Sequence, residues 1–230
     1  MGSQITVEVD DVFRHLAPML TGAGRRSIVE IGSHDGRHSD LLRLLCRERP
    51  YFISFEPDQR NQQRQAECGL RTEPFAISDR NGLAPWHASG GETPGCPGRV
   101  HTDSGSIKRP TRHLEVHPWC TFDAEGSVLT RALDTALYSF PRKDPEGQFC
   151  LEPIDLIWCD VQGAQLDVIA GAPQTLARTT YLYIELHPEP LYDGEPDLEE
   201  LHRELERVSG CGWVLVEKYS ADVLFRREGA

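Results

Sequence analysis

The sequence predicts an α/β domain built on a doubly wound, mostly parallel β-sheet with helices on both faces. Short apolar or β-branched segments alternate with segments of helical periodicity along most of the chain. Near the C-terminus two strand-like segments follow each other across a turn, which predicts an antiparallel hairpin. The length of 230 residues suits one sizeable domain, so we expect a single domain over residues 1–230.

Each element follows from its local pattern. Apolar residues at helical spacing predict an N-terminal helical segment within residues 1–25. Five strands are predicted at SIVEIG, YFISFEP, TEPFAISD, IDLIWCDV and TYLYIELH, and GWVLVEKYSADVLFRR supplies the hairpin. Helices are predicted at HSDLLRLLCRE, DQRNQQRQAECG, GAQLDVIAGA and PDLEELHRELERVSG. In the last of them Asp197 and Glu200 form a capping box, and Gly210 ends the helix.

Regular periodicity is lost between residues 80 and 130, where Gly and Pro are dense. We expect short strands at LAPWHAS and SVLTRALD with a mobile loop between them. An irregular stretch of this length in a compact domain is usually functional, so we interpret it as a lid or insert that recognises the substrate. An alternative role for Trp119 is to anchor this segment in the core. The candidate substrate contacts are Trp86, His87, His101, Ser104, Ser106, Lys108, His117 and Trp119.

Composition excludes several classes of function. The net charge of −12 argues against a broad surface for nucleic acid, although a local run from Lys108 to His113 could hold an anionic group. No stretch approaches the roughly 20 apolar residues that span a bilayer, and the polar start is unlike a signal peptide. The seven cysteines are odd in number and show no CxxC spacing, which indicates a reducing, cytoplasmic location.

The turn after the first predicted strand, GSHDG, is a candidate cofactor loop. Gly32 permits close approach of a ligand, and Gly36 permits positive φ before the helix. A dinucleotide loop needs GxGxxG, but the second glycine is missing, and Asp35 would repel a diphosphate. Glu30 adds a second acid, and Glu56 ends the next strand, where a carboxylate can accept hydrogen bonds from ribose hydroxyls.

A nucleoside with ribose hydroxyls, a positive centre and no phosphate fits this pattern. S-adenosylmethionine has those three properties, whereas NAD carries a diphosphate. The alternative interpretation is a generic α/β turn with a surface aspartate.

Through VEIGSHDG, DVQGAQLDVIAGA and YDGEP, in this order, the sequence resembles the FkbM-type S-adenosylmethionine-dependent methyltransferases, from about residue 26 to the end. The first block, VEIGSHDG, is shared by many methyltransferases. The late block, DVQGAQLDVIAGA, and the YDGEP after the fifth strand are more specific to this family. Further similar blocks are FEPD, AISD, SGSIKRP, HPWCTFDAEGSVLTRALD and YLYIELHPEPLYDGEP.

The resemblance implies a Rossmann-like class I methyltransferase fold, with a seven-stranded sheet in the order 3-2-1-4-5-7-6. It also implies roles for individual residues. The methionine end of the cofactor would lie against Glu30, Gly32, Ser33, Asp35 and Gly36; the ribose against Glu56 and Pro57; the adenine against Ala76, Ile77 and Ser78; and the reacting face against Asp160 and Gln162. The family commonly has glutamate where this chain has Gln162 and Gln165.

Acids at the ends of the fourth and fifth strands predict the reactive part of the site. Asp160 and Glu185 end strands that should be neighbours about 4.8 Å apart, so their carboxyl groups would face one crevice. His187 would follow on the same face. Asp160, Glu185 and His187 could coordinate a divalent metal such as Mg²⁺, or His187 could act as a plain general base. The structural alternatives are that Glu185 caps a helix or pairs with Arg178, and that His187 before Pro188 shapes a turn.

We therefore predict a small-molecule methyltransferase that acts on a hydroxyl oxygen, with Asp160, Glu185 and His187 as catalytic residues. The predicted substrate contacts are Ser106, Lys108, Trp119 and Gln162. Three alternatives remain: an NAD(P)-dependent oxidoreductase, a methyltransferase for nucleic acid or protein, and a cofactor-binding module without catalysis. The sequence identifies neither the acceptor nor the oligomeric state.

Overall fold

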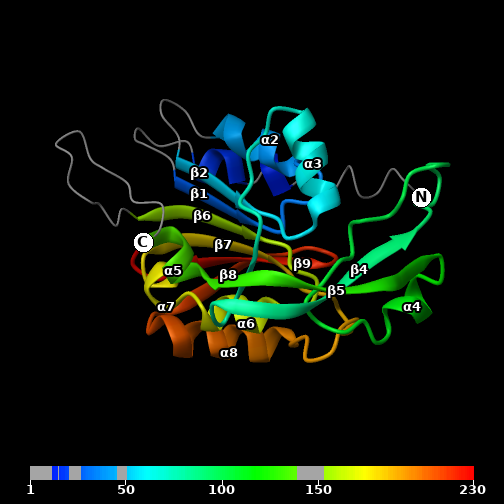
Figure 1. Ribbon diagram of the computed structural model, residues 1–230. Coiled ribbons are helices and arrows are strands. Elements are labelled where there is room, and N and C mark those ends of the chain that lie inside the picture. The colour runs from blue at the N-terminus through cyan, green and yellow to red at the C-terminus, as the bar shows by residue number, and fades with distance from the viewer. Residues whose placement is uncertain (1–11, 15, 21–26, 46–50, 139–152) are drawn as a thin grey trace.

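The computed structural model describes residues 12–14, 16–20, 27–45, 51–138 and 153–230, and it has the expected mixed α/β fold (Figure 1). Its strands are β1 (Ser27–Ile31), β2 (Tyr51–Phe55), β3 (Ala76–Ser78), β4 (Gly82–Gly91), β5 (Cys120–Ala132), β6 (Ile154–Cys159), β7 (Thr179–Glu185), β8 (Trp213–Lys218) and β9 (Asp222–Arg227). Its helices are α2 (Arg37–Leu45), α3 (Gln59–Glu67), α4 (His113–Val116), α5 (Leu133–Tyr138), α6 (Gln165–Ala170), α7 (Pro173–Leu176) and α8 (Leu198–Ser209). Residues 12–14 and 16–20 are also helical.

The main sheet has the order β2-β1-β6-β7-β9-β8. Its first four strands are parallel, and β9 and β8 form the predicted antiparallel hairpin. The prediction of seven strands in one sheet was wrong, because β3 does not join β2. The TEPFAISD segment forms only a three-residue strand, which pairs with β5 in a second sheet of order β3-β5-β4. An isolated parallel bridge pairs Phe55, at the end of β2, with Glu73, which precedes β3.

The segment between residues 80 and 130 is more regular than its composition predicts. β4 and β5 are 10 and 13 residues long and pair antiparallel over most of their length. Short strands were expected at LAPWHAS and SVLTRALD. Their length was underestimated because Gly, Ala and Pro are poor strand formers. The long cross-strand pairing outweighs that low propensity, and Pro85 is tolerated because β4 is an edge strand.

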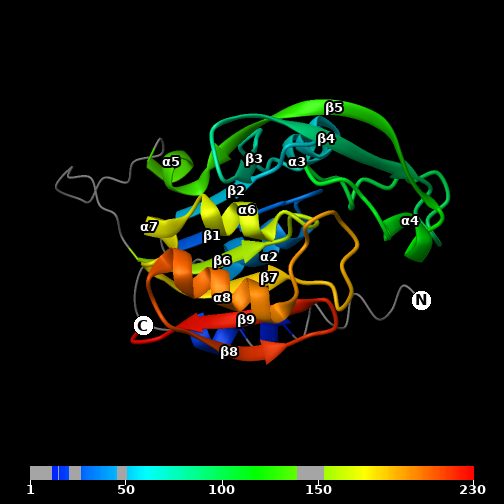
Figure 2. The same ribbon diagram turned by 90° about the horizontal axis from the view of Figure 1, so that it is seen from below.

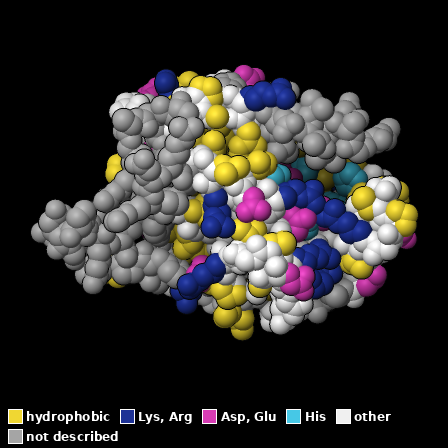
Figure 3. Space-filling view, turned by 90° about the horizontal axis from the view of Figure 1, so that it is seen from above, with side chains coloured by type: hydrophobic (Ala, Val, Ile, Leu, Met, Phe, Trp, Pro, Cys, Tyr) yellow, Lys and Arg dark blue, Asp and Glu magenta, His cyan; other side chains and the backbone are white. Residues whose placement is uncertain are grey.

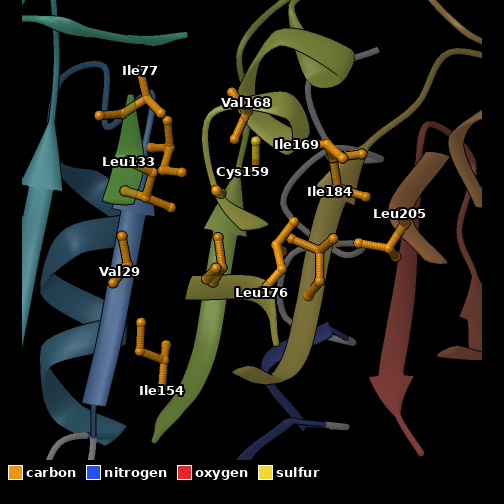
Figure 4. Packing of buried hydrophobic residues seen from close by; sticks show 14 of the residues in the cluster. Val29, Ile77, Leu133, Ile154, Cys159, Val168, Ile169, Leu176, Ile184 and Leu205 are labelled. Atoms are coloured by element: carbon orange, nitrogen blue, oxygen red, sulfur yellow. The ribbon is translucent and has the colours of Figure 1, made fainter. Parts of the chain in front are cut away.

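Helices cover both faces of the main sheet, as Figures 1 and 2 show. Strand β6 is apolar, and its alternate residues point to opposite faces of the sheet. A layer of helices is therefore needed on each face to bury them. Ile157 and Cys159 enter a cluster with α6, α7 and α8, part of which is drawn in Figure 4, whereas Leu156 and Trp158 pack with α2 and the N-terminal helical residues. Within the described ranges, no helix is long and apolar enough to cross a membrane.

The parallel strands bring their carboxyl ends to one edge of the sheet, where ligands bind in doubly wound folds. The loops after β1, β2, β6 and β7 meet there. Gly32 shows how close this approach is, because a Cβ at that position would lie 1.7 Å from the carbonyl oxygen of Asp160. Its φ of 83° also favours glycine. The fold therefore places the glycine turn directly against the end of β6.

Glu30 lies beneath this edge, in the middle of the sheet. Its side chain is fully buried; one carboxylate oxygen accepts a 2.5 Å hydrogen bond from Ser39 Oγ, and the other has no hydrogen-bond partner in the described structure. Burial raises the pKa of Glu30 to about 8, although the bond from Ser39 lowers it, and the nearby Glu56 and Asp160 raise it further. Glu30 therefore holds a proton at neutral pH.

This proton gives a prediction for stability. The folded pKa of about 8 lies above the ordinary value of 4.5, so the contribution of Glu30 is fully present below pH 4.5 and is lost as the pH rises through 8. Glu30→Gln should remove this loss, making the variant more stable than the wild type at pH 9 by on the order of a few kcal/mol. Denaturant unfolding at pH 5 and pH 9 measures it, with the exposed Glu67→Gln as control. An equal pH dependence in wild type and Glu30→Gln would contradict the prediction.

Candidate active site

A pocket opens at the carboxyl ends of β1, β2 and β6. Seven of the predicted cofactor residues line it: Gly32, Glu56, Pro57, Ala76, Ile77, Asp160 and Gln162. The side chains of Phe55 and Phe75, whose ring centroids are 5.3 Å apart, add an aromatic wall that was not predicted.

Glu56 is the buried carboxylate at the rim of β2. Its two oxygens accept hydrogen bonds from the backbone nitrogens of His34 and Asp58, at 2.7 and 2.8 Å. Burial raises the pKa of Glu56 to about 7, and these backbone bonds counteract that rise. Each carboxylate oxygen has a second lone pair, so the group can still accept hydrogen bonds from a ligand hydroxyl. Glu56 thus connects the glycine turn to the pocket.

Asp35 lies elsewhere than expected. It is not among the pocket-lining residues, and its carboxylate forms ion pairs with Arg37 at 2.8 Å and Arg99 at 3.3 Å. Burial raises the pKa of Asp35, but the pairing with Arg37 outweighs burial and holds it below the ordinary value. Since two arginines already neutralise Asp35, its charge is not directed at a ligand in the pocket.

Gly36, Ser33 and Ser78 were also predicted to bind the cofactor, but they do not line the pocket. Gly36 packs against Leu70, and a Cβ on Gly36 would lie 2.4 Å from that side chain. Ser33 accepts a 2.9 Å hydrogen bond from Gln65. Ser78 is buried and bonds to Asp79.

The segment predicted as a substrate lid forms part of this pocket. Trp86, Asp103, Gly105 and Ile107 line it together with residues of the main sheet. His34, in the glycine turn, connects the two parts, because its Nε2 atom lies 3.0 Å from Asp103 Oδ1 and 2.9 Å from Thr102 Oγ1. The φ of His34 is 46°, an unusual value for a residue other than glycine. Neither His34 nor Asp103 was predicted, since only their spatial proximity identifies them.

The predicted substrate contacts are divided between the pocket and its surroundings. Gln162 lines the pocket, and Ser106 is buried, donating a 2.6 Å hydrogen bond to the Gln162 carbonyl. Lys108 is paired with Asp167 at 2.9 Å. Trp119 is partly buried and lies edge-on to His101, with centroids 4.7 Å apart.

The acids at the ends of β6 and β7 come together as predicted, with an amide between them. The side-chain nitrogen of Gln162 donates to Asp160 Oδ1 at 2.8 Å and to Glu185 Oε2 at 2.8 Å. Burial raises the pKa of Glu185 well above its ordinary value, and the neighbouring Asp160 and Asp222 raise it further. Burial and the charge of Asp160 therefore both favour a proton on Glu185.

His187 continues this arrangement away from the pocket. Its Nε2 atom lies 3.6 Å from Glu185 Oε1, and its Nδ1 atom lies 2.7 Å from Glu195 Oε1. Glu195 was not predicted, although it belongs to the YDGEP block. Tyr192 of the same block is buried, and its hydroxyl lies 2.8 Å from the amide oxygen of Gln162.

The metal site considered for Asp160, Glu185 and His187 needs correction. In the described part of the chain, no group of three His, Cys, Asp or Glu side chains is placed to hold a metal ion. The amide of Gln162 occupies the position between the two acids, and His187 directs Nδ1 to Glu195. These side chains are therefore arranged for hydrogen bonding rather than for a shared ligand set.

Further histidines gather beside this edge. His113 is buried, with its ring 4.8 Å from that of His117 and 5.5 Å from that of Tyr192. Burial lowers the pKa of His113 to about 4, and the neighbouring histidines lower it further, so this ring is neutral at physiological pH. Figure 3 shows histidine side chains in a hollow of the surface with basic and acidic side chains at its rim.

Comparison with known proteins assigns this site to a family. A family model described as the methyltransferase FkbM domain matches residues 30–212. A relative, the 2-O-methyltransferase NoeI of Sinorhizobium fredii (strain NBRC 101917 / NGR234), is 39% identical over 180 residues, which cover 76% of this chain and 68% of the relative. The resemblance inferred from the sequence is thereby confirmed. The chain belongs to the FkbM methyltransferase family and is a methyltransferase.

Proposed function

We propose that this methyltransferase uses S-adenosylmethionine to methylate a hydroxyl oxygen of a small molecule. The charge of the pocket carries the proposal. Three carboxyl side chains, Glu56, Asp103 and Asp160, line it, and no Lys or Arg is among its described lining residues. Such a pocket suits a cationic nucleoside and disfavours a diphosphate, which argues against the NAD(P)-dependent alternative.

The lining residues fit the parts of this cofactor. Glu56 would accept hydrogen bonds from the ribose hydroxyls, and Phe75, Ala76 and Ile77 would pack against the adenine. Asp160, on the opposite side, would lie near the positive centre. When bound, the cofactor supplies an electrophilic methyl carbon attached to a sulfonium sulfur.

The protein would contribute alignment and proton removal to this reaction. Methyl transfer is an in-line displacement, so the acceptor oxygen must be held behind the methyl carbon. The chain of side chains from Asp160 through Glu185 to His187 begins at the pocket and leads away from it. His187 would take the proton of the acceptor hydroxyl, while Asp160 and the protonated Glu185 would orient the acceptor.

The relative supports oxygen as the methylated atom, because its name describes a 2-O-methyltransferase. Two residues of the basic run that suggested a nucleic-acid substrate are paired with acids, Lys108 with Asp167 and Arg112 with Glu189. A cytoplasmic location is part of the proposal. It is supported by the described cysteines, Cys68, Cys96, Cys120, Cys159 and Cys211, which are all free.

Calorimetry tests the cofactor directly. S-adenosylhomocysteine should bind the protein with micromolar affinity, and NADH at least about 100-fold more weakly, because the pocket has carboxylates where a diphosphate would need cations. Glu56→Ala should weaken S-adenosylhomocysteine by about tenfold or more through the lost ribose hydrogen bonds. The exposed Glu67→Gln should leave binding unchanged. Tighter binding of NADH than of S-adenosylhomocysteine would refute the proposed cofactor.

Methyl transfer tests the chemistry separately. With a hydroxyl acceptor identified by screening with radiolabelled S-adenosylmethionine, His187→Asn should lower kcat by roughly 10²–10⁴-fold, the usual contribution of a general base. The affinity for S-adenosylhomocysteine should stay within a few-fold, since His187 does not line the pocket. A variant with full activity would show that His187 takes no part in the chemistry.

A further inference from the structure

We propose that Glu195 is a positioning residue for methyl transfer, which fixes His187 in the form that accepts the proton of the acceptor hydroxyl. The inference rests on the proposed function, because it assigns a partner to the base of that same site. It is carried by the hydrogen bonds of two side chains on the loop between β7 and α8.

The carboxylate of Glu195 is held rigidly. Its side chain has no exposed surface. Oε2 accepts hydrogen bonds from the backbone nitrogens of Leu191 and Tyr192, at 2.8 and 3.2 Å, and Oε1 lies 2.7 Å from His187 Nδ1. Burial raises the pKa of Glu195, but the bonds from His187 and the backbone outweigh burial and hold it below the ordinary value. Glu195 is therefore ionised and can only accept hydrogen bonds.

An ionised partner determines which nitrogen of His187 carries the proton. Nδ1 must donate to Glu195, so the neutral tautomer that Glu195 selects has its lone pair on Nε2. Nε2 lies 3.6 Å from Glu185 Oε1, on the side of Asp160 and Glu185. The side chain of His187 is 16% exposed. The arrangement matches the role of a buried acid that orients a catalytic imidazole and stabilises its charged form.

The other groups around His187 do not replace Glu195. Burial raises the pKa of Glu185, which favours its neutral form. Burial lowers the pKa values of the nearby His113 and His117. Tyr192 stands 6.4 Å from the His187 ring, and burial raises the pKa of its hydroxyl, so it stays neutral. Asp160 lies beyond Gln162 and Glu185. Glu195 is thus the ionised carboxylate in direct contact with the imidazole in the described structure.

The proposed step moves one proton to His187 and one methyl group to the acceptor oxygen. The acceptor hydroxyl gives its proton to Nε2 of His187, while its oxygen forms the new bond to the methyl carbon. The bond from that carbon to sulfur breaks, and its electron pair stays on sulfur. The resulting imidazolium is paired with Glu195 until its proton leaves to solvent.

Glu195→Gln is a specific test because the surroundings dictate how its amide must lie. The backbone nitrogens of Leu191 and Tyr192 require an acceptor, so the amide oxygen takes the place of Oε2. The NH₂ group then faces His187 Nδ1, which must accept, and the proton moves to Nε2. The variant keeps its shape but loses the free lone pair, and we expect kcat to fall by roughly 10²–10⁴-fold with little change in KM.

Nitrogen-15 NMR of the ligand-free protein, with labelled histidine, measures which nitrogen of His187 carries the proton. It needs no methyl-acceptor substrate. His187 should carry its proton on Nδ1 in the wild type and on Nε2 in Glu195→Gln. Glu189→Gln is the matched control, since Glu189 is an exposed glutamate on the same loop that pairs with Arg112. It should change neither the spectrum nor the activity. A wild-type proton on Nε2, or an unchanged spectrum in Glu195→Gln, would overturn the proposal.

Kinetics with the screened acceptor complete the test. The double variant His187→Asn with Glu195→Gln should be no slower than His187→Asn alone, because Glu195 acts through His187. Full activity of Glu195→Gln, or additive losses in the double variant, would overturn the assignment. A wild type that binds S-adenosylhomocysteine but transfers no methyl group to any hydroxyl would instead refute the proposed function. The NMR result remains a separate measure of the Glu195–His187 pair.

Discussion

The hydrogen bonds of Gln162 between Asp160 and Glu185 are the interaction on which the site depends. Two neighbouring parallel strands end in acids, and two carboxylates this close cannot both be ionised without a donor and a proton between them. The amide nitrogen supplies the donor, at 2.8 Å from each acid, and the raised pKa of Glu185 supplies the proton. The sheet edge can therefore hold an acid pair without an opposing cation.

The same residue joins the separate parts of the site. Gln162 has a φ of 52°, which carries its carbonyl to Ser106 of the insert and its side-chain oxygen to Tyr192 of the loop after β7. Positive φ costs free energy in a residue other than glycine, and such strain persists where surrounding contacts determine the conformation. Gln162 thus lines the pocket and is hydrogen-bonded both to the insert and to the loop that holds His187.

Much of this site follows from the sequence. Parallel strands must bring Gly32, Glu56 and Asp160 to one edge, so their proximity was predictable. The ion pair between Asp35 and Arg99 could not be predicted, because Arg99 lies 64 residues away, within the insert. The length of β4 and β5 was hidden by residues of low strand propensity, and the separation of β3 depends on pairing with β5. Glu195 becomes recognisable only once the loop places it beside His187.

The central claim, that Gln162 must donate between two acids, is tested by the pH dependence of stability in Gln162→Glu. This substitution keeps the shape but sets a third carboxyl group against Asp160 and Glu185, so the folded variant must take up a proton. Its free energy of unfolding should approach that of the wild type near pH 5 and fall below it by up to roughly 1.4 kcal/mol per pH unit toward pH 8. A difference that stays constant from pH 5 to pH 8 would contradict the account.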